Sequence, residues 1–300
     1  MNKKRKKNRM KIRRKPDWLK TTMVSGEHYA FVKKMIEEHH LHTICSSGKC
    51  PNKAECWSLG TATFMIMGDI CTRTCKFCAT KSGKPLPLDP EEPEKLAKSI
   101  QLMQLKHCVI TSVDRDDLPD KGAGHWKACV QKVRELNPDI IIELLIPDYD
   151  RTLVDIVCEG GPDIIAHNLE TVARLTPEVR SKATYRKSME TLQHIIDAGK
   201  ISKTGIMVGL GETEEEVIEL LKEVAAIGCQ MVTIGQYLQP TKENIEVVDY
   251  ITPEQFEKYK QIALELGFSS VESAPLVRSS YMAERSFLKK IEEQKKQNHA

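Results

Sequence analysis

Short apolar runs suited to buried parallel strands recur along most of the chain. Each run is rich in branched residues and bounded by polar residues, glycine or proline, as expected for strands covered on both faces. Helical patterns separate the runs, so we expect one parallel sheet built from strand–helix units. The runs occupy residues 62–70, 107–113, 140–147, 162–169, 203–210 and 230–238.

Helix start signals fall between these runs and after the last of them. Thr213 is followed three residues later by Glu216, which is the pattern of a capping box. Thr252 precedes a proline and a glutamate and predicts a helix start by the same logic. Asp89, which also precedes a proline, predicts a helix that begins there. Residues 26–40 read as a further helix, before the first strand.

Side chains able to carry chemistry come at or just after several strand ends. A site built from residues at the ends of many strands favours a barrel or partial barrel, because all such residues lie at the carboxyl-end rim of the barrel. We therefore expect an α/β fold, specifically a partial (β/α)6 barrel of the TIM type. The strand-end residues are Cys71 after the first run, Asn168 and Glu170 at the fourth, Gly211 after the fifth and Gln236 in the sixth.

Charge is divided unevenly along the chain. Residues 1–16 hold ten of the 45 Lys and Arg residues and no acid, which leaves 35 basic against 42 acidic residues in the remainder. A block of like charges is typically solvated, so we expect a disordered tail. The alternative is electrostatic steering of an acidic partner.

The cysteines indicate metal binding. No apolar run reaches the ~18 residues of a membrane span and no signal-peptide core follows the start, so we expect a cytoplasmic protein with no membrane partner. In a reducing compartment, clustered cysteines indicate metals before disulfides. Six of the ten fall within residues 45–78. The other four are expected in the core, namely Cys108, Cys129, Cys158 and Cys229.

Cys71, Cys75 and Cys78 form a C-x3-C-x2-C triplet directly after the first strand. A structural zinc site needs four ligands, and no fourth cysteine lies near in sequence. A 4Fe–4S cluster held by three thiolates instead leaves one iron open for an exogenous ligand. In this strand context the triplet resembles the signature of the radical S-adenosylmethionine (SAM) superfamily, in which the open iron binds the methionine moiety of SAM.

A second triplet, Cys45, Cys50 and Cys56, has the spacing C-x4-C-x5-C. Three cysteines again indicate a cluster with one ligand of another type, although zinc stays open as an alternative. Arg278-Ser279-Ser280-Tyr281, near the other end of the chain, carries no signal by itself.

Taken together, these motifs resemble the lipoyl synthase family of the radical SAM superfamily. The segments LHTICSSGKCPNKAECW, ATFMIMGDICTRTCKFCAT, SVDRDDLPD and PLVRSSY occur in the family's order, and the resemblance covers roughly residues 14–285. It implies that Ser280 ligates an auxiliary 4Fe–4S cluster with the second triplet. The candidate SAM contacts, by strand-end position and by resemblance, are Asn168, Glu170, Arg186, Gly211 and Gln236.

The resemblance also implies an activity. A sulfurtransferase of this family inserts two sulfur atoms at C6 and C8 of a protein-bound octanoyl-lysine, using two 4Fe–4S clusters and SAM, and consumes the auxiliary cluster as sulfur donor. Another radical SAM enzyme, inserting sulfur elsewhere or modifying RNA, stays open as the alternative.

The implied partners are octanoylated lipoyl-carrier domains, either the E2 subunit of a 2-oxoacid dehydrogenase or the glycine cleavage H protein. An electron donor such as ferredoxin or flavodoxin and an iron–sulfur carrier are also implied, and no nucleic acid is expected. Four segments are expected: the tail (1–16), an extension with the auxiliary-cluster cysteines (17–60), the barrel (61–268) and a C-terminal segment (269–300).

Overall fold

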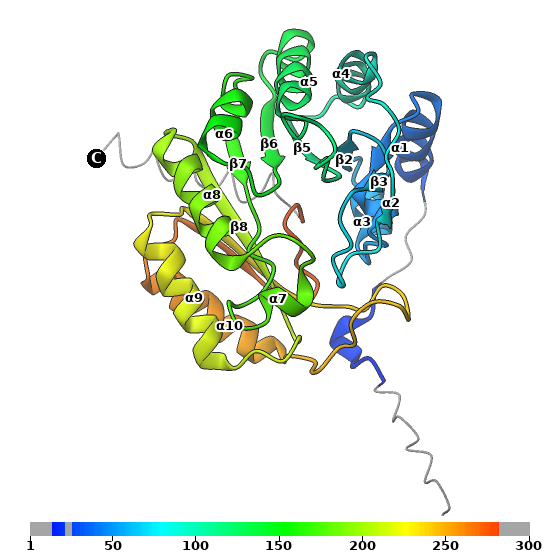
Figure 1. The fold of residues 1–300 in the computed structure, drawn as a ribbon. Helices are drawn as coiled ribbons and strands as arrows, with labels where there is room; N and C mark the ends of the chain where they lie inside the picture. The colour runs from blue at the N-terminus through cyan, green and yellow to red at the C-terminus, as the bar shows by residue number, and fades with distance from the viewer. Residues whose placement is uncertain (1–13, 22–25, 282–300) are drawn as a thin grey trace, which may run out of the picture.

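A curved eight-stranded sheet forms the centre of the molecule in the computed structural model, which describes residues 14–21 and 26–281 (Figure 1). Seven neighbouring strands run parallel, and β1 pairs antiparallel with β2 at one edge. In sheet order the strands are β1 (His42–Thr43), β2 (Thr63–Ile66), β5 (His107–Ser112), β6 (Ile141–Leu145), β7 (Ile164–Ala166), β8 (Ile201–Val208), β9 (Met231–Gln236) and β10 (Ser270–Ser273).

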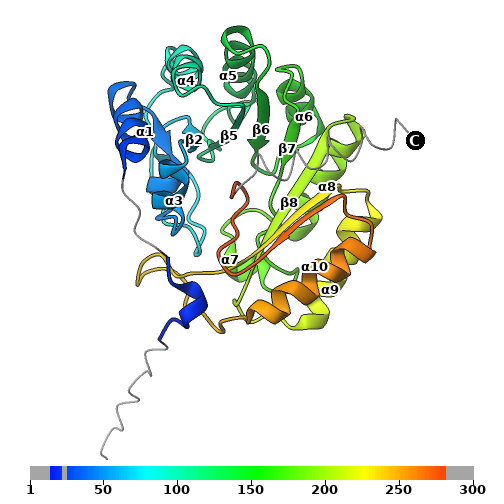
Figure 2. The same ribbon diagram turned by 180° about the vertical axis from the view of Figure 1, so that it is seen from behind.

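Helices cover the convex face of this sheet, as both views show (Figures 1 and 2). The outer helices are α4 (Glu92–Leu102), α5 (Ala123–Leu136), α6 (Arg151–Cys158), α8 (Tyr185–Asp197), α9 (Glu214–Ala226) and α10 (Pro253–Glu265). The N-terminal region adds η1 (Asp17–Leu19), α1 (Glu27–Glu38), α2 (Ile44–Ser47) and α3 (Lys53–Ser58), and α7 (Thr176–Val179) follows β7. A separate two-stranded sheet pairs β3 (Ile70–Cys71) with β4 (Lys81–Ser82).

The expected partial barrel is confirmed, since all six predicted strands are present and parallel. β10, a seventh parallel strand, was not predicted, because only Val271 in it is buried and no apolar run marks it. The first predicted run is wrong in one respect. The backbone turns at Met67 and Gly68, both with positive φ, so the run divides into β2 and β3.

Two of the three predicted helix starts are confirmed. Thr213 makes a complete capping box with Glu216, and the Thr252 side chain accepts the Gln255 N–H. The third helix starts later than predicted, at Glu92. Asp89 instead closes a turn before it, accepting the Glu91 N–H at 2.9 Å.

The four scattered cysteines are not all core residues. Cys108, Cys129 and Cys229 are buried, whereas Cys158 near the end of α6 is only partly buried. Most of the expected disordered tail, residues 1–13, lies outside the described residues, as do residues 282–300. Among the described residues, no helix is long and apolar enough to cross a membrane.

The described part of the C-terminal segment that follows β10, residues 274–281, enters the barrel (Figures 1 and 2). Its backbone hydrogen-bonds to β9, where the Gln236 N–H donates to the Pro275 carbonyl at 3.2 Å. Gly235 makes this approach possible, because a Cβ there would lie 2.1 Å from the Val277 carbonyl oxygen. Residues 276–281 are thereby brought to Asn52, Glu55 and Thr63, which precede or begin β2.

Candidate active site

The first cysteine triplet lies on a loop closed by the small sheet. Cys71 ends β3, and Cys75 and Cys78 lie on the connection to β4. The Gly83 N–H donates to the Cys71 carbonyl at 2.9 Å and completes the closure. All three thiols are partly exposed, so the loop presents its sulfurs near the carboxyl ends of the barrel strands.

Backbone amides are directed at two of these sulfurs. The N–H groups of Arg73 and Asp114 each donate to Cys71 Sγ at 3.4 Å, and the Thr80 N–H donates to Cys78 Sγ at 3.5 Å. Burial raises the pKa of Cys71 to about 12, and it raises the pKa of Cys78 as well. Because burial disfavours the charged thiolates, a bound cation is needed to stabilise them. Amide donors around cluster sulfurs are typical of iron–sulfur sites. The donor set therefore fits a cluster.

The second triplet lines a cavity of about 270 Å³ together with Ser280. Cys45 lies in α2, Cys56 lies in α3, and Cys50 lies between the two helices. Burial, reinforced by the neighbouring thiols, raises the pKa of Cys56 to about 12. The structure thus brings three cysteines and a distant serine to one concave site, as the sequence resemblance implied.

Hydrogen bonds hold the C-terminal segment against this cavity. Thr63 Oγ1 donates to Ser280 Oγ at 2.7 Å, and the Asn52 side chain donates to a carbonyl of the segment at the same distance. The Tyr281 hydroxyl donates to Glu55 at 3.2 Å. Contacts from β2, α3 and the preceding turn therefore fix the serine next to the cysteines.

A smaller cavity of about 130 Å³ lies at the strand ends beside the first triplet. It is lined by Cys75 together with Asn168, Glu170 and Arg180. Asn168 Nδ2 donates to Ser279 Oγ at 2.8 Å, while its buried Oδ1 has no hydrogen-bond partner among the described residues. An unpartnered buried oxygen calls for a donor, and a bound cofactor can supply it. Two predicted contacts, Asn168 and Glu170, are thus brought beside Cys75 of the first triplet.

Gln236 does not face this cavity. Its side chain is fully buried, and Nε2 donates to three backbone carbonyls, those of Val208, Tyr237 and Asp249, at 2.9 to 3.1 Å. Its Oε1 accepts the Ile251 N–H at 2.8 Å. Every polar atom of the Gln236 side chain is already paired within the protein, so the predicted SAM contact is not supported. The side chain instead joins β9 to the loop that contains Asp249 and Ile251.

Arg186 and Gly211 also lie outside both cavities described above. The Arg186 side chain is 89% exposed and pairs with Glu190 one helical turn away, so its predicted cofactor contact is not supported. Arg180, which the sequence analysis did not identify, lines the smaller cavity, where Arg186 had been expected. Gly211 has φ of 106° and makes a turn that only glycine adopts readily.

Comparisons with known proteins agree with this geometry. A family model described as the radical SAM superfamily matches residues 65–224, and one described as the N-terminal domain of lipoyl synthase matches residues 1–50. The chain is 58% identical to lipoyl synthase of Parabacteroides distasonis, covering 91% of this chain and 98% of the relative. It is 54% identical to that of Treponema denticola, with coverage of 92% and 96%. The chain belongs to the lipoyl synthase family.

Membership in the lipoyl synthase family confirms the expected activity and cofactors, namely radical insertion of sulfur with 4Fe–4S clusters and SAM. It also implies an octanoylated lipoyl-carrier substrate. Solved structures support the fold alone. Methylornithine synthase matches with a TM-score of 0.57 at 15% identity over 80% of this chain and 70% of its own. The hydrogenase maturase HydG of Carboxydothermus hydrogenoformans matches with 0.55 at 15%, over 82% and 65%.

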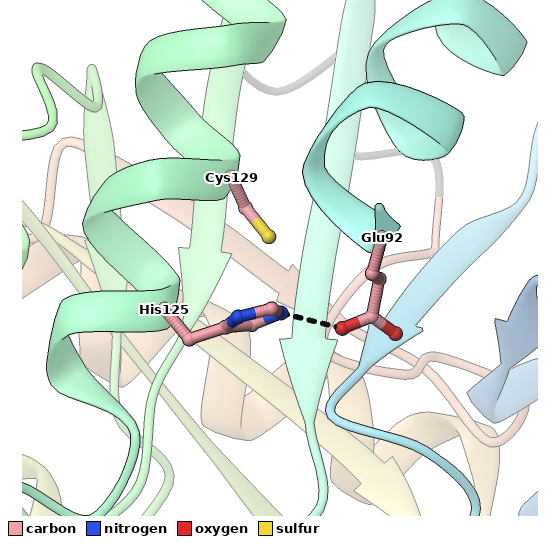
Figure 3. A group of neighbouring side chains, drawn as sticks. All are labelled: Glu92, His125 and Cys129. Atoms are coloured by element: carbon pink, nitrogen blue, oxygen red, sulfur yellow. Dashed lines mark hydrogen bonds and ion pairs between the residues drawn. The ribbon is translucent and has the colours of Figure 1, made fainter. Parts of the chain in front are cut away.

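A third group of ligand-type side chains lies away from both cysteine triplets (Figure 3). Glu92 Oε2 accepts the Met67 N–H at 2.9 Å and contacts His125 Nε2 at 2.6 Å, with Cys129 one turn further along α5. These bonds join α4 and α5 to the end of β2. Since the carboxylate and the imidazole already satisfy each other, we interpret this group as a structural tie between elements.

Proposed function

We propose that the two triplets divide the work of lipoyl synthesis in this chain. Cys71, Cys75 and Cys78 would hold the cluster that binds SAM. The residues around the larger cavity, Cys45, Cys50, Cys56 and Ser280, would hold the auxiliary cluster that supplies sulfur. The observation that carries this assignment is the cavity itself, which gathers three thiols from one end of the chain and a serine from the other.

When bound, the cluster and SAM together would supply a radical able to remove hydrogen from an unactivated C–H bond, which acid–base chemistry cannot break. The residues of the chain contribute position and exclusion of water. Gly205 and Gly235 lack a Cβ where the C-terminal segment passes; a Cβ on Gly205 would lie 3.2 Å from Ser279 Oγ. The segment therefore runs through the barrel close to both proposed sites.

We propose that Asn168, Glu170 and Arg180 bind SAM. Arg180 Nη1 donates to the Asn168 carbonyl at 3.4 Å and to Ser188 Oγ at 2.6 Å, which orients the guanidinium. Burial raises the pKa of Glu170, and the charge of Arg180 opposes that rise. A carboxylate, an unpartnered amide oxygen and a guanidinium complement the ammonium and carboxylate groups of an amino-acid moiety.

Substitution of the two adjacent serines tests the ligand assignment. Ser280→Ala should lower iron below about eight atoms per chain, because one iron of the auxiliary cluster loses its only protein ligand and no SAM replaces it. Ser279→Ala is the matched control, because Ser279 faces Asn168 and does not line the larger cavity. It should keep about eight iron atoms. Equal iron contents in the two variants would contradict the assignment.

Ser280→Cys addresses the reason for a serine at this position. An oxygen ligand is harder than a thiolate and is exchanged more readily on iron–sulfur clusters. The variant should hold a full auxiliary cluster yet give little lipoyl product, measured by mass on an octanoylated peptide. An unchanged lipoyl yield would show that the serine is not needed for sulfur release.

We propose as partners the octanoylated domains of 2-oxoacid dehydrogenases or the glycine cleavage H protein, with ferredoxin or flavodoxin as electron donor and an iron–sulfur carrier to rebuild the auxiliary cluster. The cytoplasm is the compartment we propose, since none of the ten cysteines forms a disulfide. Turnover with each octanoylated carrier domain in competition would identify the preferred substrate.

A further inference from the structure

Arg73 lies within the first cysteine loop, between Cys71 and Cys75, and is only 7% exposed. Three carboxylates surround its guanidinium. Nε and Nη2 donate to the two oxygens of Asp116, both at 2.9 Å, and Nη1 donates to Asp148. Nη1 also lies 3.3 Å from Asp114 Oδ1. Acidic side chains therefore contact all three guanidinium nitrogens of Arg73.

These acids come from the barrel and not from the loop. Asp114 and Asp116 follow β5, and Asp148 follows β6. The bidentate pair with Asp116 fixes the plane of the guanidinium as well as its position. The loop backbone is joined to the same place: the Thr72 hydroxyl donates to the Asp114 carbonyl at 2.9 Å and accepts the Asp116 N–H at 3.1 Å.

The charges in this group depend on one another. Arg73 holds the pKa of Asp116 well below its usual range, and the acids raise the pKa of Arg73 in return. Asp116 has a second cationic partner, Lys182, at 3.2 Å near the rim. Removing one member of a buried ionic group leaves the remaining charges without a partner, which is strongly destabilising. Loss of any one of these charges would therefore weaken the attachment of the loop to the barrel.

We propose that Arg73 is the positioning residue of the first cysteine loop, holding Cys71 where the amides of Arg73 and Asp114 reach its sulfur. This role rests on the assignment of that triplet as cluster ligands made above. Amide donors to cluster sulfurs stabilise the reduced cluster and raise its reduction potential. Arg73 and its three acids therefore affect both the retention of the SAM-binding cluster and its potential, without touching substrate.

Iron content and reduction potential test this role in the full-length reconstituted protein. Arg73→Gln should lower iron from about eight to about four per chain, with the auxiliary cluster retained. Arg174→Gln is the matched control, since Arg174 makes an equivalent bidentate pair with Glu216 on the surface, at 2.7 and 2.9 Å. It should keep about eight iron atoms.

Two milder variants keep the proposal testable if Arg73→Gln fails to fold. Arg73→Lys keeps the positive charge but loses the planar guanidinium that pairs with both oxygens of Asp116. This variant should release iron from the cluster on the first triplet to a chelator about tenfold faster than wild type. Asp148→Asn should retain the iron but lower the potential measured by redox titration monitored by electron paramagnetic resonance, whereas removal of the negative charge without any shift of the loop would raise it. Wild-type release rates and potentials in both variants would overturn the proposal.

The outcome separates this role from the proposed function. If the wild-type protein holds two clusters but makes no lipoyl product, the proposed function fails. The iron content of the Arg73 variants would still show whether Arg73 positions the first cysteine loop. If the Arg73 variants match wild type while lipoyl product forms normally, only the positioning role fails.

Discussion

Replacing Gly235 with alanine tests whether the C-terminal segment must lie inside the barrel. The added Cβ would lie 2.1 Å from the Val277 carbonyl oxygen and 3.0 Å from its carbon. Ordinary contact begins near 3.4 Å, so the carbonyl would have to move by about 1.3 Å. The obstructing atoms are backbone, and Val277 is itself buried, so no side-chain rotation relieves the clash.

The expected cost follows from this overpacking. Forced expansion of a packed core costs about 1–3 kcal/mol, and at about 2–4 °C per kcal/mol for a large domain the melting temperature should fall by about 2–12 °C. Displacement also reaches Ser280, three residues beyond Val277. We therefore expect the auxiliary cluster to be lost first, with iron falling towards about four atoms per chain.

The assay pairs thermal unfolding with iron analysis of the reconstituted protein. Gly26→Ala is the control, because Gly26 is extended and a Cβ there meets nothing within 4 Å. This control should retain about eight iron atoms. A Gly235→Ala protein with a wild-type melting temperature and a full iron content would refute the placement of the segment.

Three further predictions follow from the same structure. Gln236→Leu leaves several buried backbone groups unpaired and should lower the free energy of unfolding by about 3 kcal/mol or more in urea titrations. Arg180→Gln should weaken SAM binding about tenfold by calorimetry, whereas the exposed Arg186→Gln should leave it unchanged. Burial lowers the pKa of His167 from 6.5 to about 4. Unfolding therefore takes up a proton below pH 6.5, and stability falls as the pH drops. Between pH 7.5 and 5.5 wild type should lose about 1 kcal/mol more than His167→Gln in urea titrations.

The barrel could be predicted because its strands are continuous apolar runs, which burial on both faces requires. β10 could not, since only Val271 in it is buried and its other side chains carry no periodic signal. The cysteine ligands could be proposed because metal sites constrain residue type and spacing together. Their meeting with Ser280 depends on the path of the C-terminal segment through the barrel, which no local pattern encodes.

The candidate SAM contacts were harder to predict, because a strand-end position does not say where a side chain points. Gln236 ends β9, yet its amide is consumed by backbone partners. Arg186 stands four residues before Glu190 in a helix, and that spacing is a surface ion-pair signal that favours exposure. Arg180 lies in the loop beyond β7 and α7, and only the fold brings it to the cavity.

The central claim is that the cluster on Cys45, Cys50, Cys56 and Ser280 supplies the sulfur. Its most direct test is a single turnover with protein reconstituted with ³⁴S-sulfide, in unlabelled buffer, with SAM, reductant and an octanoylated lipoyl-domain peptide. The claim predicts lipoyl product carrying two ³⁴S atoms, and loss of the auxiliary cluster with it. Unlabelled lipoyl product, or 5′-deoxyadenosine formed with no thiolated octanoyl chain, would contradict it.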